Sequence, residues 1–177
     1  MHHVKTTLIV IAMIILSHGT SHAQRNSVGT SWSLAGIGIT YERYSSEDAF
    51  AQVAVQVDLG ETFIGRVVYP GLCSSFTWNL VFAEIESRNG TPITFFAGPG
   101  ITAGISKDFA GPKGLFFGLK GKAGMQCIFE RGINISLSLA PVLGIHLSKT
   151  DENFITRTYK NGILQTFLPE IGISYRF

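Results

Sequence analysis

The feature that most constrains this chain is a stretch of alternation between residues 133 and 148. Apolar side chains occupy every second position except Pro141: Ile133, Ile135, Leu137, Leu139, Leu143, Ile145 and Leu147. Alternation with a period of two predicts a β-strand with one apolar and one polar face. The polar face holds Asn134, Ser136, Ser138, Ala140, Val142, Gly144 and His146, without a charge. A strand facing water normally carries charge, so this face is expected to fill a narrow barrel interior and the apolar face to meet lipid.

The same alternation, with turn residues between the stretches, predicts six further strands. They span residues 31–44, 50–58, 75–86, 93–106, 114–130 and about 163–177. In the first of them the alternation changes phase near Ala35-Gly36, which is consistent with a β-bulge. An open sheet edge in hydrocarbon would leave backbone groups unpaired, so the sheet is expected to close. The predicted fold class is therefore all-β, a single closed antiparallel transmembrane barrel, with eight strands as the expected number.

Seven strands leave such a barrel one short, because bacterial single-chain barrels have an even number. We expect the eighth at residues 62–69, and the alternative is residues 153–160. The first choice places short turns on the periplasmic side, at Gly60, Asn89 and Gly132. It places the longer connections outside the cell, at residues 107–113 and 149–162. The alternative would invert this asymmetry of the loops.

Composition agrees with a surface that meets lipid. Charged residues make up 15% of the chain, against about 25–35% at the surface of a typical soluble protein. The formal net charge is only +2, and no basic patch indicates binding of nucleic acid. No stretch after the first 23 residues approaches the length of a transmembrane helix.

The amino terminus is typical of a secretory signal peptide. Lys5 is followed by nine uninterrupted apolar residues, 8–16, fewer than the roughly 20 that a membrane-anchoring helix needs. Small residues at Ser21 and Ala23 fit a cleavage site before Gln24. We therefore expect residues 1–23 to be removed on export and residues 24–177 to form one barrel domain.

The carboxyl terminus alternates in the same way and ends on an aromatic residue. Ile171, Ile173, Tyr175 and Phe177 share one face of the predicted last strand. This pattern resembles the terminal strand of the outer-membrane β-barrels of Gram-negative bacteria, in which a final Phe after alternating apolar residues is an assembly signal. The resemblance implies location in the outer membrane, recognition by the barrel-assembly machinery, and contact with outer-membrane lipid and lipopolysaccharide.

Several charged and polar residues fall on predicted lumen faces. They are Lys120, Lys122, Gln126 and Glu130 on one strand, Glu84 and Glu86 on another, and Glu170 and Arg176 on the last. Such residues could form an ion path or an internal network of ion pairs. Eight strands enclose a lumen that side chains just fill, and buried charge is costly unless paired. We therefore expect a filled, internally paired lumen.

His146-Leu147-Ser148 is the one hint of catalysis, because a His and a Ser two apart on a strand face the same side. The motif resembles the His-x-Ser element of outer-membrane lipid A 3-O-deacylases, which are also small eight-stranded barrels. That family has Asn after the Ser, where this chain has Lys149, and an orienting Glu about a dozen residues later, where it has Lys160. Alternation also places His146 and Ser148 on the lumen side, away from lipid, so we expect a hydrogen-bonded lumen histidine.

No cofactor or metal site is expected. Four of the five histidines belong to the signal peptide, and the only cysteines are Cys73 and Cys127, too few ligands for structural zinc. Cys73 is expected in the connection after Pro70-Gly71 on the outer side, and Cys127 near the periplasmic end. A disulfide tolerates Cα separations of only about 7 Å, so the two are expected not to bond.

The function expected is a structural or surface-interaction role through extracellular loops, without enzymatic activity and as a monomer. The principal loop, 149–162, carries charges of both signs: Lys149, Asp151, Glu152, Arg157 and Lys160. The alternative is an outer-membrane lipid-modifying enzyme that uses His146 and Ser148. A third possibility is a soluble periplasmic lipid-binding barrel.

Overall fold

The computed structural model describes residues 25–34, 36–59, 70–87, 90–108, 112–129, 131–150, 153–165 and 168–177. The expected signal peptide, residues 1–23, and the cleavage site before Gln24 lie outside them. The strands are β1 (Asn26–Ser33), β2 (Gly36–Ser46), β3 (Ala49–Asp58), β4 (Gly71–Glu86), β5 (Pro92–Lys107), β6 (Lys113–Ile128), β7 (Ile133–Leu139), β8 (Val142–Thr150), β9 (Asn153–Thr158) and β10 (Glu170–Arg176). One short helix, α2 (Lys160–Gln165), precedes β10. In the described part, no helix has the length and apolar character needed to cross a membrane.

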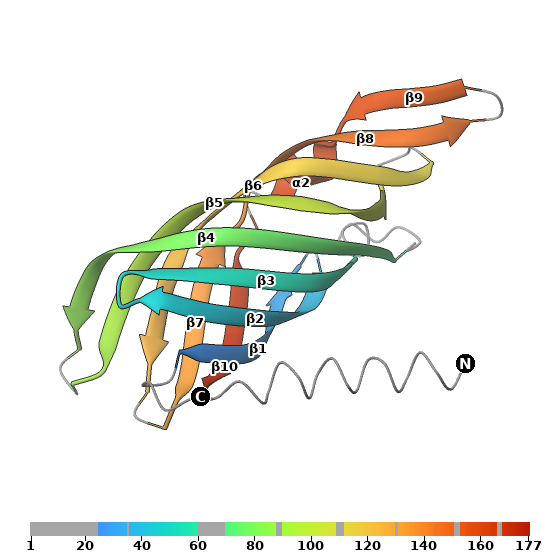
Figure 1. Cartoon of the computed structure of the whole chain (residues 1–177). Coiled ribbons are helices and arrows are strands. Elements are labelled where there is room, and N and C mark those ends of the chain that lie inside the picture. The colour runs from blue at the N-terminus through green and yellow to red at the C-terminus, as the bar shows by residue number, and fades with distance from the viewer. Residues whose placement is uncertain are drawn as a thin grey trace, which may run out of the picture.

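Eight of these strands close into an antiparallel barrel, which confirms the prediction of an all-β chain with a single closed eight-stranded barrel. The order around it is β1–β2–β3–β4–β5–β6–β7–β10, and β10 pairs with β1 (Figure 1). β8 continues β7 after the break at Ala140-Pro141, and the two pair with successive parts of β6. β9 pairs with β8 beyond the level at which β10 begins.

The outer face is apolar and the lumen is polar, the inverse of a soluble protein. Leu137, Leu139 and Ile173 are exposed on the outside, at 42%, 44% and 55%, whereas Ser138 and Ser174 are buried inside. The expectation about which side chains point outward is therefore confirmed on these strands. It follows from the pleat alone, which sends successive side chains to opposite faces.

One row of paired residues passes around the whole barrel and shows how the strands are staggered. The row runs from Leu137 through Ile171, Trp32, Ile37, Val57, Leu72, Ile105 and Leu115 to Leu147. The row starts on β7 and ends on β8, which continues β7. Its last residue, Leu147, lies ten positions after its first, Leu137. Such a stagger goes with strands tilted by roughly 35–45° and a lumen that side chains fill. Every member of the row is apolar.

The prediction of the eighth barrel strand was wrong. Residues 31–44 form parts of two strands, because β1 and β2 are a hairpin with Ser33 opposite Gly36. A two-residue turn shifts the alternation by one position, as a bulge does, so the phase change at Ala35-Gly36 did not distinguish them. Residues 62–69 lie outside the described part, and the barrel closes without them because β3 pairs directly with β4. Residues 153–158 do form a strand, β9, but among the described strands it pairs only with β8 and stands outside the ring of eight.

Two further predicted boundaries differ from the structure. The segment 163–177 begins in α2, and its strand, β10, starts only at Glu170. The segment 133–148 is divided at Pro141, which has no N–H for a strand ladder.

The two ends of the barrel differ in their connections. Asn26 and Phe177 exchange backbone hydrogen bonds of 3.1 and 2.8 Å, so both chain ends reach what we call the terminal end. The β2–β3, β4–β5 and β6–β7 turns lie there, the last two with Gly90 and Gly132 at positive φ. The connections predicted at residues 107–113 and 149–162 lie at the opposite, distal end, as predicted, although β9 and α2 occupy part of the second. Gly60 and Asn89 lie outside the described residues; β3 ends at the distal end, whereas a turn on the other side was expected after it.

Candidate functional site

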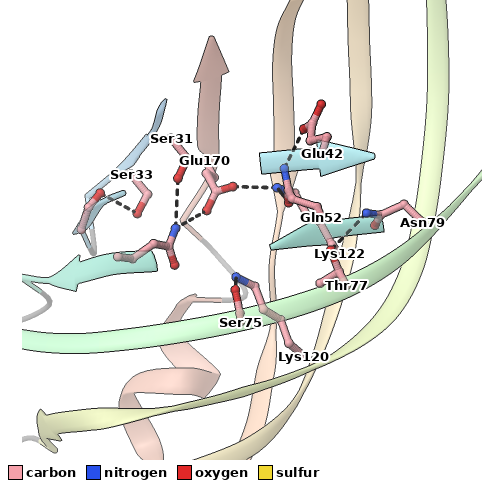
Figure 2. Close-up of polar contacts among 12 residues, drawn as sticks. Ser31, Ser33, Glu42, Gln52, Ser75, Thr77, Asn79, Lys120, Lys122 and Glu170 are labelled. Atoms are coloured by element: carbon pink, nitrogen blue, oxygen red, sulfur yellow. Dashed lines mark hydrogen bonds and ion pairs between the residues drawn. The ribbon is translucent and has the colours of Figure 1, made fainter. Parts of the chain in front are cut away.

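A buried ion pair stands at the centre of the lumen (Figure 2). Lys122 Nζ of β6 lies 2.8 Å from Glu170 Oε1 of β10, and the side chains are 3% and 8% exposed. Lys122 also donates to Gln52 Oε1 at 2.6 Å. Gln56 Nε2 donates to the other carboxylate oxygen of Glu170 at 2.9 Å. Both charges are thus paired and hydrogen-bonded, which is the condition for burying them.

The network continues from the ion pair toward the terminal end. Gln52 Nε2 donates to Glu42 Oε1 at 2.7 Å (Figure 2). Glu42 also accepts from the hydroxyl of Tyr44 at 3.2 Å. The Tyr44 ring stacks on Phe50, with 5.1 Å between centroids. The guanidinium carbon of Arg176 lies 3.6 Å above the same ring. Aromatic rings and a cation therefore fill this end of the lumen.

On the distal side of the ion pair the lumen retains a small cavity. Lys120 Nζ donates to Ser75 Oγ at 3.1 Å (Figure 2). The Lys120 side chain lines the cavity together with Glu170, Asp58 and Cys73. The cavity measures about 30 Å³. A water needs at least about 10–15 Å³ of such volume, so this space is suited to one or two waters and to no larger ligand.

Tyr159 and α2 fill the distal end. The Tyr159 ring is 1% exposed and stacks on Phe116 with 4.4 Å between centroids, and its hydroxyl donates to Asp58 Oδ2 at 3.2 Å. Burial, and then the nearby Asp58 carboxylate, raise the pKa of the Tyr159 hydroxyl above its ordinary value. The Asp108 carboxylate accepts the backbone N–H groups of Lys160 at 3.2 Å and Asn161 at 2.9 Å. These contacts satisfy N–H donors at the start of α2 that the helix itself cannot.

The predicted lumen residues have mixed outcomes. Lys120, Lys122, Gln126 and Glu170 are buried in the lumen, as expected, and Arg176 is half-buried over Tyr44. Glu84 and Glu86 are exposed, so their assignment to the lumen was wrong. β3 begins opposite Leu80, and the part of β4 beyond it, after a bulge between Val81 and Ala83, extends past the barrel wall. Glu130 lies outside the described residues.

His146 and Ser148 are buried in the lumen, at 2% and 3% exposure. The Nε2 of His146 lies 3.0 Å from the backbone carbonyl oxygen of Ser106, so this nitrogen is the donor when the bond forms. The imidazole lies beside the Tyr159 ring, with 6.3 Å between centroids and 15° between planes. The residues therefore lie in the packed distal layer of the lumen, away from the outer surface.

Cys73 and Cys127 lie toward opposite ends of the barrel. Cys73 is in β4, opposite Gly104, rather than in the connection before that strand, and Cys127 is in β6, opposite Ile135. Both are free thiols. Within the described residues, no cluster of three or more His, Cys, Asp or Glu could hold a metal ion.

Several residues of the network were not predicted from the sequence. They are Glu42, Tyr44, Gln52, Gln56, Asp58, Asp108 and Tyr159. The first five lie on β2 and β3 at the alternate positions that face inward, so the rule applied to residues 133–148 could have found them. Asp108 and Tyr159 lie outside the strands, where alternation has no meaning.

Within the residues that the structure describes, the outer surface carries exposed charge only near its two ends. Exposed charged residues of the described part near the terminal end are Arg25, Arg43, Glu47, Asp48, Glu84, Glu86 and Arg131; near the distal end they are Lys113, Lys149, Arg157 and Lys160. Between them lie exposed large apolar residues from every barrel strand. The molecule thus has an apolar belt between two charged rims.

No protein-family model matches the chain, and neither a curated protein nor a solved structure matches it. What the protein does is therefore inferred from the chemistry of its lumen and its outer surface.

Proposed function

We propose that the protein is an integral barrel of the outer membrane of a Gram-negative bacterium, with a structural or surface-interaction role at its distal end. The observation that carries the proposal is the apolar belt around a closed polar lumen. A monomeric soluble protein rarely exposes an apolar patch of more than a few hundred Å². In a bilayer the belt meets lipid, and closure pairs the backbone groups that hydrocarbon cannot satisfy.

The terminal strand supports assembly through the barrel machinery. Ile171, Ile173, Tyr175 and Phe177 all point outward and are exposed, and Phe177 ends at the terminal rim. Outward aromatics at the rim suit the interface between hydrocarbon and headgroups. With export through the expected signal peptide, residues 24–177 would be inserted with both chain ends in the periplasm.

This orientation places the distal end outside the cell. Lys149, Arg157 and Lys160 are exposed there, while Asp151 and Glu152 lie outside the described residues. Cations at this level suit the anionic headgroups of outer-membrane lipid and lipopolysaccharide. We therefore propose that the distal end makes the contacts that define the protein's role, as a monomer.

The two competing functions receive no support from the geometry. A lipid-modifying enzyme needs its nucleophile within reach of lipid, and Ser148 is buried in the lumen with His146. A soluble lipid carrier needs an apolar interior space. Here the central part of the lumen is lined by charged and amide side chains, and the cavity beside the ion pair measures only about 30 Å³.

Fractionation and gel mobility test the proposal. The full chain should appear in the outer-membrane fraction and run faster on gels when it is not boiled, because a folded barrel resists the detergent. Lipid A should have the same mass with and without the gene. Recovery in the soluble periplasmic fraction would overturn the membrane assignment, and loss of an acyl chain from lipid A would restore the enzymatic alternative.

A further inference from the structure

The last part of β4 has a neighbouring strand on one side only. The N–H of Val81 donates to the carbonyl oxygen of Asp48, in the β2–β3 turn, at 2.8 Å, and β3 extends no further in this direction. Beyond Val81, the residues of β4 pair only with β5 among the described strands. In Figure 1 the β4–β5 hairpin continues past the β2–β3 turn. Residues 82–86 therefore form an open sheet edge at the terminal rim, which we call the β4 edge.

The backbone of the β4 edge has hydrogen-bonding groups that point away from β5. Residues of an antiparallel pair alternate between those that exchange hydrogen bonds with the neighbouring strand and those that do not. The hydrogen bond of 3.0 Å from the N–H of Ser87 to the carbonyl oxygen of Thr91 sets the phase of this alternation. Glu84 and Glu86 therefore direct their N–H and C=O groups to the open side. An exposed row of such groups is a template for a further strand.

Carboxylates surround the β4 edge. Glu84 and Glu86 are exposed on the face that continues the lumen side of β4, since Glu84 lies opposite the lumen residue Thr94. The β2–β3 turn adds Glu47 and Asp48, which are also exposed. The charged side chains of the edge and of this turn are thus all negative.

The opposite face of the β4 edge is apolar. Ile85 is 56% exposed opposite Ile93, and Phe82, at 68%, has its ring centroid 6.5 Å from that of Phe95. If the edge paired with a second copy of itself, Glu84 would face Glu84 or Glu86 of that copy, and like charges opposite each other destabilise a sheet. The charges therefore select a partner strand that carries cations.

We propose that the β4 edge binds an extended segment of a periplasmic protein in which basic and apolar residues alternate. The segment adds to β4 as a further strand, so that its backbone supplies affinity and its alternate side chains supply specificity. Its basic side chains lie beside Glu84 and Glu86, and its apolar side chains cover Ile85. The β4 edge is separate from the distal end, and only the location of the partner in the periplasm rests on the proposed function.

The test uses the purified full chain in neutral phosphatidylcholine nanodiscs, with a fluorescent peptide of alternating Lys and Val as the probe. Fluorescence anisotropy should show saturable binding that is absent from empty nanodiscs and from a peptide of alternating Glu and Val. The bound peptide should slow hydrogen exchange, measured by NMR, at the amides of Glu84 and Glu86. The same Lys–Val peptide with its backbone N-methylated keeps its charge but cannot pair as a strand, and should not bind.

Variants of the edge separate charge from backbone pairing. Each cross-strand pair of opposite charges contributes at most about fivefold in affinity, so E84Q/E86Q should bind the Lys–Val peptide about tenfold more weakly. Glu84→Pro also removes the N–H on the open side, where an edge strand tolerates proline, and should bind more weakly than Glu84→Gln. R25Q/R43Q/R131Q removes exposed cations from other segments of the terminal rim. This control should bind at least as tightly as the wild type.

Equal binding by E84Q/E86Q and the wild type, equal binding of the N-methylated peptide, or binding without protection of the two amides would overturn the proposal. A dimer seen by native mass spectrometry, with the same amides protected before peptide is added, would mean that a second copy covers the edge instead. Gel mobility of the same samples reports insertion separately, so failure of the wild type to insert would count against the proposed function.

Discussion

At the scale of single residues, the centre of the lumen depends on a pair of opposite charges from distant parts of the sequence. Lys122 and Glu170 are 48 positions apart and both nearly inaccessible. Taking a lysine and a glutamate out of water is costly, and the cost is offset only while each has the other. Gln52 and Gln56 hold the remaining hydrogen bonds, so the four side chains act as a unit.

Glu170→Gln should therefore destabilise the barrel strongly. It leaves the Lys122 ammonium buried without its counter-charge, which costs about 3–5 kcal/mol when one partner of a buried pair is removed. The free energy of unfolding, measured by urea titration in vesicles, is the readout. Glu86→Gln, at an exposed rim position, is the matched control and should change it by less than about 0.5 kcal/mol. A Glu170→Gln protein as stable as the control would contradict the role of the pair.

At the scale of elements, α2 has too few turns to be stable by itself. It has six residues, and its position is set by Asp108 from the end of β5 and by Tyr159 stacked on Phe116. The helix is thus held by side chains from the barrel wall, and it fills the distal end of the lumen together with Tyr159.

Asp108→Ala should loosen α2 while leaving the barrel intact. Removing a carboxylate that accepts backbone N–H groups at a helix start costs about 0.5–2 kcal/mol. Hydrogen exchange should show faster exchange at the amides of Lys160 and Asn161, with the strands unchanged. Lys160→Ala is the control, because that side chain is exposed. Unchanged exchange in Asp108→Ala would mean that packing of Tyr159 alone holds the helix.

The last strand, β10, carries a prediction about assembly. Deleting Phe177 should lower outer-membrane levels far more than loss of one exposed ring explains, if the assembly signal proposed from the resemblance includes that residue. Phe82→Ala provides the comparison, since Phe82 is an outward aromatic at 68% exposure on β4. Quantitative blotting of membrane fractions is the measurement. Equal levels in both variants would argue that the resemblance does not extend to assembly.

At the scale of the whole molecule, apolar side chains cover the outside of the barrel and polar side chains fill its inside, the inverse of a soluble protein. The apolar row from Leu137 to Leu147 encircles the barrel, while the inward positions hold the polar network. A charge placed on the belt should therefore cost most midway between the rims.

Leu139→Arg tests this dependence on depth. Arginine on the lipid face costs about 2–4 kcal/mol near the midplane and about 0–1 kcal/mol near an interface. Leu139 lies opposite Ala123, well within β6, whereas Ile133 directly follows the terminal-end turn. Ile133→Arg is thus the shallow control in the same vesicle unfolding assay. Equal costs at both positions would contradict a membrane-spanning belt.

Which side chains face outward could be predicted from the sequence by itself, because the pleat is a local property with a period of two residues. Leu137, Leu139 and Ser138 are placed correctly on that basis. The burial of Lys120, Lys122 and Glu170 follows from the same rule together with the narrowness of an eight-stranded lumen.

Only the tertiary structure decided how the barrel closes and which lumen residues meet. A two-residue turn and a bulge change the phase of alternation equally, so Ala35-Gly36 could not identify the β1–β2 hairpin as the source of the eighth strand. The contact of Lys122 with Glu170 requires β7 to pair with both β6 and β10, because Ser138 then lies opposite Gly124 on one side and opposite Glu170 on the other. The position of α2 is likewise non-local, because the Asp108 carboxylate at the end of β5 binds the backbone N–H groups of Lys160 and Asn161, more than 50 positions further along the chain. Alternation acts between adjacent residues, whereas closure is a condition on the whole ring of strands.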